Sequence, residues 1–163
     1  MSNRSFVTSS VLAAVALLSA CATPVTRASA DTPSSRSRDA IESARSQVAA
    51  MLAGAATNWN RGDLDAFMSD YLPESRTTFI GRTGVLRGPG AIRSVYAARF
   101  APGGVRDSLS FEALEVDLLS ENAANAIAWY VLSRGDSTIA RGPTSLVLVR
   151  RDGRWRIVHD HSS

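Results

Sequence analysis

The sequence predicts an α+β domain in which helices pack on one face of a curved, mainly antiparallel sheet. Two observations predict this class: apolar residues recur at helical spacing in the first half, and four strand-like segments follow one another after residue 107. The chain has 163 residues, enough for one domain and a tail. Its 45% hydrophobic and 20% charged residues are typical of a globular protein.

A long amphipathic helix is expected from residue 39 to about residue 61. Asp39 and Glu42 have the spacing of a capping box, and Gly62 ends the pattern. The apolar stripe of this helix consists of Ile41, Ala44, Val48, Leu52, Ala55 and Trp59.

Two shorter helices flank a pair of short strands. Asp63 can cap a helix that ends before Pro73. Residues 76–86 carry strand-type residues around a Gly81–Gly84 turn, and Gly88-Pro89 can begin a third helix. The apolar positions of the two helices are Leu64, Phe67, Met68 and Tyr71, then Ile92, Val95, Tyr96 and Phe100.

The second half predicts four antiparallel strands, at residues 108–119, 126–133, 137–150 and 154–161. A change in the apolar phase within the first of them predicts a bulge near Ala113. Asp152-Gly153 is a strong signal for a two-residue hairpin.

Regular pairing across this hairpin places Leu146 opposite His159 and Thr144 opposite His161. One face would then carry both histidines, and the other would carry Asp160. Both faces are apolar enough to need cover, and three helices can cover only one, so the second face is a candidate subunit interface. The two expected faces are Thr144, Leu146, Leu148, Trp155, Ile157, His159 and His161, against Val147, Val149, Val158 and Asp160.

The N-terminal residues are typical of an export signal. Residues 11–18 are apolar but too few to span a membrane, and Leu18-Ser19-Ala20-Cys21 resembles the bacterial lipobox. That resemblance implies removal of residues 1–20 as a signal peptide and lipidation of Cys21. The alternative is an ordinary secretory signal with an incidental cysteine. Residues 21–38 would be the lipidated cysteine and a flexible linker, leaving residues 39–163 as the domain.

Lipidation would anchor the protein in the bacterial cell envelope. Ala22 stands where the inner-membrane retention signal has Asp, which favours the outer membrane, facing the periplasm.

Composition excludes several classes of function. All 18 basic residues are Arg, so no Schiff-base or P-loop lysine exists. The net charge of +3 is scattered, so nucleic acid is not an expected partner. The single Cys and two His give too few ligands for a zinc site, and no nucleotide-binding or metalloprotease motif occurs, so we expect neither metal nor organic cofactor.

Two motifs carry a resemblance to a known superfamily. Asn60-Arg61-Gly62-Asp63 after the first helix and residues 151–162 (RDGRWRIVHDHS) at the end resemble the nuclear transport factor 2-like superfamily. The tail is most similar to the SnoaL-like group and to the association domain of calmodulin-dependent kinase II.

The resemblance covers residues 39–163 and implies a conical barrel, a curved sheet wrapped around three helices with an internal pocket, commonly dimeric through the sheet. It also implies that Ile127, Trp129 and Val131 face the pocket. Val131 and Leu146 stand where the kinase domain has arginines that hold carboxylates.

These considerations give a set of candidate site residues. The cavity is expected to be lined by Trp59, Tyr71, Phe79, Tyr96, Trp129, Val131, Leu146, His159 and His161. Tyr71 and Tyr96 offer hydroxyl groups, and His159 could exchange a proton. For His161 we favour a hydrogen bond to a backbone group near the first helix over a role in the cavity. Glu115 and Asp117 are expected in solvent.

Three functions remain open. The first is a lipid-anchored envelope protein that binds a small, mostly apolar ligand in its pocket, as a homodimer through the outer sheet face. The second is a cofactor-independent isomerase, cyclase or dehydratase that uses His159 with Tyr71 or Tyr96 as catalytic residues. The third is a non-catalytic dimerisation module whose interior is filled by its own side chains; a cavity below roughly 300 Å³ would favour it.

Overall fold

The computed structural model describes residues 35–163. The predicted signal peptide, Cys21 and linker residues 22–34 lie outside the described residues. The helices are α1 (Ser35–Arg61), α2 (Leu64–Met68) and α3 (Pro89–Phe100). The strands are β1 (Thr78–Gly81), β2 (Gly84–Arg87), β3 (Ser108–Ser120), β4 (Ala123–Arg134), β5 (Ser137–Arg151) and β6 (Arg154–Ser162).

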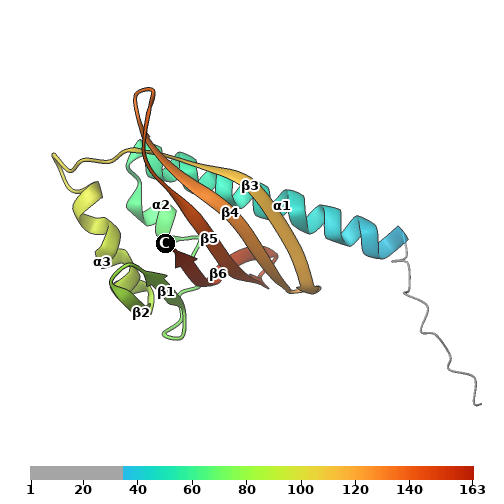
Figure 1. Cartoon of the computed structure of the whole chain (residues 1–163). Helices are drawn as coiled ribbons and strands as arrows, with labels where there is room; N and C mark the ends of the chain where they lie inside the picture. Colours follow the sequence, from blue (N-terminus) through green and yellow to red (C-terminus); the bar gives the residue numbers. More distant parts are fainter. Residues whose placement is uncertain (1–34) are drawn as a thin grey trace, which may run out of the picture. The chain divides into compact units, whose positions relative to one another are not determined.

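The strands form one open, curved sheet in the order β2-β1-β6-β5-β4-β3. Every neighbouring pair is antiparallel except β1 and β6, which run parallel. Helix α1 lies along the long strands, and α3 lies beside β1 and β2 (Figure 1). The predicted α+β class with a curved, mainly antiparallel sheet is therefore confirmed.

The face of α1 that packs on the sheet is the predicted one. Its buried residues are Ala44, Val48, Leu52, Ala55 and Trp59, spaced three or four apart. The predicted start of this helix is wrong. The helix already includes Ser35, so Asp39 and Glu42 lie within it and cannot form an N-terminal capping box.

The end of α1 is fastened to the edge strand β3. The side chain of Asn60 imitates a neighbouring strand: its Nδ2 donates to the Leu109 carbonyl at 3.0 Å, and its Oδ1 accepts from the Leu109 amide at 2.7 Å. Trp59 Nε1 donates to the Asp107 carbonyl at 2.8 Å. Edge-strand groups that would otherwise be unpaired are thereby satisfied.

Helix caps and a strand bulge occur where local signals in the sequence predict them. The Asp63 side chain caps α2 by accepting from the Ala66 amide at 2.9 Å, and Pro89 opens α3. The predicted bulge in β3 is present: the register shifts between Glu112 and Glu115, and Ala113 has a φ of 49°.

A second bulge, in β6, was not predicted. The hairpin begins as expected, with Arg150 opposite Trp155 and Leu148 opposite Ile157, but the register then shifts and Leu146 pairs with Asp160. The expected pairing of Leu146 with His159 is wrong, because Val158 is the extra residue of the bulge. His159 and His161 consequently pair with Val147 and Ser145, on the face away from the helices.

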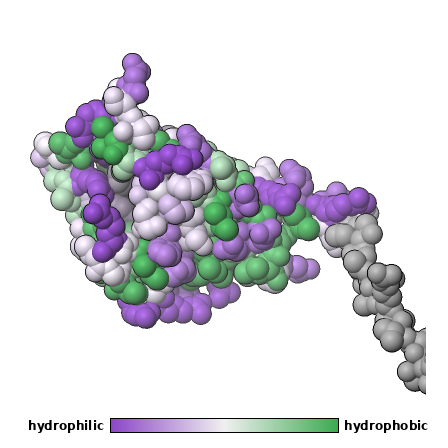
Figure 2. Space-filling view, viewed as in Figure 1, coloured by the Kyte–Doolittle hydropathy of each residue, from purple (hydrophilic) through white to green (hydrophobic). Residues whose placement is uncertain are grey.

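The outer face of the sheet carries a cluster of apolar residues on β4 and β5. Ile127 is 43% exposed, and the face also carries Trp129, Pro143 and Val147. Seen from the side drawn in Figure 1, hydrophobic areas of the surface alternate with hydrophilic ones (Figure 2). No helix among the described residues is long and apolar enough to cross a membrane.

Candidate functional site

A cavity of about 340 Å³ lies between the inner face of the sheet and the ends of the helices. Its walls come from the last turns of α1, from α2 and the segment after it, from α3, and from every strand but β2. The aromatic and aliphatic lining residues include Leu52, Trp59, Phe67, Tyr71, Phe79, Tyr96, Leu109, Phe111, Tyr130, Leu132, Leu146 and Ile157.

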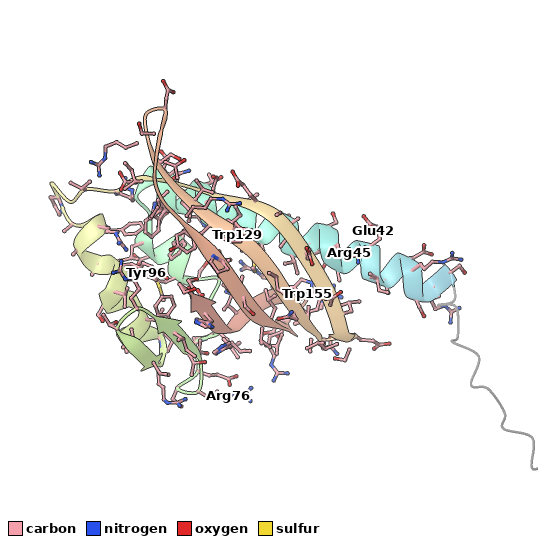
Figure 3. All side chains as sticks on the ribbon, in the orientation of Figure 1. Glu42, Arg45, Arg76, Tyr96, Trp129 and Trp155 are labelled. Atoms are coloured by element: carbon pink, nitrogen blue, oxygen red, sulfur yellow. The ribbon has the colours of Figure 1, made fainter. Side chains whose placement is uncertain are left out.

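Aromatic rings form the helical wall of this cavity. Trp59 meets Phe67, Tyr96 and Phe100 edge-on, with ring centroids 5.1–5.7 Å apart. Tyr96 projects from α3 (Figure 3) and also contacts Phe67, at 5.2 Å. Edge-to-face contacts of this kind fix ring orientation, so this wall is preformed.

A hydrogen-bonded polar centre lies within the largely apolar lining. Tyr71 donates its hydroxyl hydrogen to Asp160 Oδ2 at 2.6 Å, and the Tyr96 hydroxyl lies 3.4 Å from that of Tyr71. On the other side of the carboxyl group, Ser162 Oγ donates to Asp160 Oδ1 at 2.6 Å, and Thr144 Oγ1 lies 2.8 Å from Ser162 Oγ. The two tyrosines, the carboxyl group and two hydroxyls therefore form a connected network.

The backbone explains how Tyr71 and Asp160 meet. The segment after α2 adds one bridge beside β6: the Leu72 amide donates to the Ile157 carbonyl, and the Ile157 amide donates to the Asp70 carbonyl, each at 2.8 Å. This bridge fixes Tyr71 beside β6. The bulge at Val158 then turns Asp160 inward, to within reach of the Tyr71 hydroxyl.

Burial changes the protonation equilibria of this network. It raises the pKa of Asp160, while hydrogen bonds from Ser162 and Tyr71 and the nearby His159 oppose the rise. Burial together with the Asp160 charge raises the pKa of Tyr71 well above its usual value, and burial raises that of Tyr96. Near neutral pH the tyrosines therefore act as hydroxyl donors, and Asp160 is the group of the network that can exchange a proton.

The predicted site residues divide into two sets. Trp59, Tyr71, Phe79, Tyr96 and Leu146 line the cavity. The other four, Trp129, Val131, His159 and His161, lie outside it.

The reason is strand phase. On β4 the residues that face inward are Tyr130 and Leu132, so Trp129 and Val131 point the other way, and so does Ile127. The expectation that these three face the pocket is therefore wrong. Trp129 instead lies under the Arg141 guanidinium, 4.1 Å from its ring centre.

The histidines are on the outer face as well. His159 Nδ1 lies 2.7 Å from Thr78 Oγ1 on β1, and His161 is exposed. The assignment of His159 as a pocket acid or base is therefore wrong, because the β6 bulge reverses its direction. Arg99, in the last turn of α3, does reach the cavity lining. Glu115 and Asp117 are exposed, as predicted.

Sequence reasoning missed the central carboxyl group of the site. Strict alternation along β6 placed Asp160 on the outer face, and nothing in Ile157-Val158-His159 marks a bulge. Within the part of the chain that the structure describes, no three His, Cys, Asp or Glu side chains come together as a metal site would require.

Comparison with known proteins assigns the family. The sequence profile of the SnoaL-like domain matches residues 48–163, so the chain belongs to the SnoaL-like domain family. No match is found among curated proteins. An NTF-2-like protein of unknown function from Shewanella oneidensis MR-1 superposes with a TM-score of 0.66 and 29% identity, over 72% of this chain and 97% of the other.

Two further structures share the fold. One, from Novosphingobium aromaticivorans DSM 12444, is provisionally assigned as a scytalone dehydratase; it has a TM-score of 0.66 and 12% identity, over 77% of this chain and 86% of the other. The second, from Xanthomonas campestris, is provisionally assigned as a calcium/calmodulin-dependent protein kinase II association domain. Its TM-score is 0.57, with 18% identity over 71% of this chain and 84% of the other.

A second buried carboxyl group, that of Asp70, also lines the cavity. The residue is 8% exposed, and its Oδ2 has no hydrogen-bond partner within residues 35–163. Burial raises the pKa of Asp70 from 3.8 to about 6, against the opposing charges of Arg156 and Arg154. The neutral form of Asp70 therefore predominates in the fold only below about pH 6, and the carboxylate predominates at neutral pH.

The Asp70→Asn variant tests the raised pKa of Asp70 directly. Because the folded-state pKa is raised, the contribution of Asp70 to stability is fully present below about pH 4 and is lost as the pH rises through about 6. Between pH 4 and pH 7 the wild type should therefore lose up to about 3 kcal/mol of unfolding free energy relative to Asp70→Asn. Denaturant unfolding across this pH range measures the difference.

Asn58→Ala is the control. Asn58 is neutral and lines the same pocket as Asp70, so its replacement should raise or lower the unfolding free energy by the same amount at every pH. Parallel curves for the wild type and Asp70→Asn would contradict the raised pKa.

Proposed function

We propose that the cavity binds a small, mostly apolar molecule that carries one polar group. The observation behind this is a preformed, aromatic-lined space of about 340 Å³ with one hydrogen-bonding network on its wall. That volume lies within the range of small-molecule sites. It argues against the purely structural module, in which the chain's own side chains would fill the interior.

The Tyr96 hydroxyl is the group best suited to meet the ligand. Tyr71 and Ser162 already donate to Asp160 at short distances. Within residues 35–163, the Tyr96 hydroxyl has only the longer contact of 3.4 Å to the Tyr71 hydroxyl. A ligand hydroxyl or carbonyl oxygen beside Tyr96 would complete its hydrogen bonding. The rest of such a ligand would pack against Trp59, Phe67 and Phe79.

Binding of 2-naphthol, compared with naphthalene, tests the polar contact. We expect 2-naphthol to bind about tenfold more tightly, since a hydrogen bond of about 1.4 kcal/mol corresponds to that factor. Tyr96→Phe should remove this preference while leaving naphthalene binding unchanged. Titration followed by fluorescence of the two probes gives both affinities.

Thr138→Val provides the matched control, since it removes an exposed hydroxyl at the start of β5, away from the cavity. If the preference for 2-naphthol survived in Tyr96→Phe, the assignment of Tyr96 would be refuted. If neither probe bound, the cavity would not be a ligand site.

The second candidate function is cofactor-independent proton transfer. It is favoured by one observation: a carboxyl group with a raised pKa lies in an apolar cavity beside two tyrosine hydroxyls. Asp160 would take a proton from the carbon next to a ketone, and the electron pair would move to the carbonyl oxygen. Tyr96 would donate a hydrogen bond to that oxygen, and Asp160 would return the proton.

Exchange of the α-protons of 2-tetralone in deuterated water tests this function. The wild type should accelerate exchange over buffer, and Asp160→Asn should lower the rate by about 100-fold or more. Proton NMR follows the loss of signal. Asp117→Asn, an exposed carboxylate on β3, is the control expected to keep the wild-type rate. Equal rates for Asp160→Asn and the wild type would remove Asp160 from the mechanism.

We also propose that the protein is anchored in the bacterial envelope through Cys21, at the outer membrane facing the periplasm. The support is the sequence Leu18-Ser19-Ala20-Cys21 behind a short apolar segment. Three acyl chains on the mature terminus would hold the protein stably, because each buried CH₂ contributes about 0.8 kcal/mol.

Expression in a bacterium tests the anchor. The mature protein should begin at Cys21, carry the added mass of acyl chains and partition into detergent, whereas Cys21→Ala should lack both the added mass and the partitioning. Mass spectrometry of the two proteins measures the difference. A wild-type protein with an unmodified Cys21 would contradict the proposal.

Pairing of two copies through the outer sheet face is the remaining proposal. It is supported by the apolar residues of that face, among which Ile127 is 43% exposed. A two-fold pairing would bring Ile127 of both copies close to the centre of the contact and remove it from water.

Ile127→Glu should therefore convert a dimer into a monomer, since it would bury a carboxylate in the contact. Val85→Glu is the control: Val85 is 53% exposed but lies on β2, away from the proposed contact. Native mass spectrometry counts the subunits. A wild-type monomer, or an Ile127→Glu dimer, would refute this interface.

A further inference from the structure

A second pocket lies between the middle of α1 and the β5–β6 hairpin. Its volume is about 520 Å³, and Trp155, Arg150 and Asp70 are among the residues that line it. Figure 3 shows that Trp155 lies well away from Tyr96, which marks the first cavity. Asp70 lines both spaces and so belongs to the wall between them.

Three of the residues that line this pocket each have a buried polar side-chain atom with no hydrogen-bond partner within the described residues. These atoms are Arg150 Nε, Trp155 Nε1 and Asp70 Oδ2. They are also the complete set of such side-chain atoms in residues 35–163. Trp155 is 5% exposed and Asp70 is 8% exposed, so neither is a surface group in free contact with solvent.

The fold fixes the three groups independently of one another. Arg150 and Trp155 are opposite each other at the base of the hairpin, so their side chains share the inner face. Asp70 is held by its backbone, whose carbonyl accepts from the Ile157 amide at 2.8 Å. Leaving a buried polar group unpaired costs about 1–3 kcal/mol, so three in one pocket indicate a ligand that satisfies them together.

The chemistry of the three atoms defines that ligand. Arg150 and Trp155 offer N–H donors, and Arg150 adds a positive charge, so this side of the pocket suits a carboxylate. Asp70 Oδ2 is an acceptor and suits an N–H donor. Ala50, Met51 and the Trp155 ring supply apolar surface. A simple anion would leave Asp70 unpaired, and a simple amine would leave Arg150 and Trp155 unpaired.

We propose that this second pocket binds a free amino acid with an apolar side chain. Its carboxylate accepts hydrogen bonds from Arg150 and Trp155, and its ammonium group donates to Asp70. The side chain packs against Met51 and Ala50. The proposal does not rest on the function proposed for the first cavity.

Three probes separate the alternatives: L-leucine, 4-methylpentanoate, which lacks only the ammonium group, and 3-methylbutylamine, which lacks only the carboxylate. The purified full-length chain is titrated at neutral pH, and the indole N–H signals of its three tryptophans are followed by NMR. Trp155→Phe identifies the signal of Trp155. L-leucine should shift that signal, and each analogue should bind at least about tenfold more weakly.

Variants test the individual contacts. Arg150→Gln should weaken L-leucine binding at least about tenfold, because it removes the charged donor. Arg151→Gln, the exposed neighbour outside the pocket, should bind as the wild type does. Asp70→Asn should narrow the difference in affinity between L-leucine and 4-methylpentanoate, because only L-leucine has an ammonium group that can donate to the Asp70 carboxylate.

Two results would overturn the proposal. Absence of a Trp155 shift with all three probes up to about 10 mM would show that the pocket does not take this class of ligand. Equal affinity for L-leucine and 4-methylpentanoate would make it a plain anion site. An unchanged signal dispersion in Arg150→Gln confirms that this variant is folded, so that a loss of binding is attributable to the contact.

Discussion

The backbone bridge between the segment after α2 and β6 is the constraint on which the rest of the site depends. Two hydrogen bonds of 2.8 Å join Asp70 and Leu72 to Ile157. The residue between them, Tyr71, is thereby fixed opposite Ile157 on β6. Ile157 directly precedes the bulge at Val158. The bridge fixes the backbone of Tyr71, and without the bulge Asp160 would face outward.

The same constraint organises both spaces in the inner sheet face. Tyr71 points to Asp160 and completes the polar centre of the first cavity, while Asp70 lies in the wall shared with the second pocket. The consecutive residues Asp70 and Tyr71 therefore contribute to two neighbouring sites. Tyr71, Asp160, Thr144 and Ser162 in the first cavity bond to one another, whereas Arg150 Nε and Trp155 Nε1 beside the second pocket have no partner within the described residues. The second pocket therefore favours a polar ligand, and the first cavity favours a largely apolar one.

Periodicity and turn chemistry were sufficient to predict the architecture. The stripe ending at Trp59, the Asp63 cap and the Asp152-Gly153 hairpin each depend on local interactions that the sequence displays. The phase change near Ala113 even revealed the β3 bulge. The cavity residues that belong to the apolar stripes of the helices could be predicted by the same reasoning, as Trp59 and Tyr96 show.

The bulge at Val158 could not be predicted in this way. A β-branched residue in an apolar strand is compatible with either phase, and the choice is made by tertiary contacts: Asp160 inward gains the Tyr71 and Ser162 hydroxyls. A one-residue shift exchanges histidine for aspartate in the cavity. It thereby replaces the expected imidazole chemistry by that of a buried carboxyl group, and the candidate mechanism changes with it.

A double-mutant cycle with Tyr71→Phe and Asp160→Asn tests the central claim most directly. If the hydroxyl and the carboxyl group form a buried hydrogen bond, the effects of the two substitutions on unfolding free energy should be non-additive, with a coupling of about 1–3 kcal/mol. The same cycle with His159→Asn in place of Asp160→Asn should give little coupling. Additive effects for Tyr71 and Asp160, with coupling found instead to His159, would contradict the account.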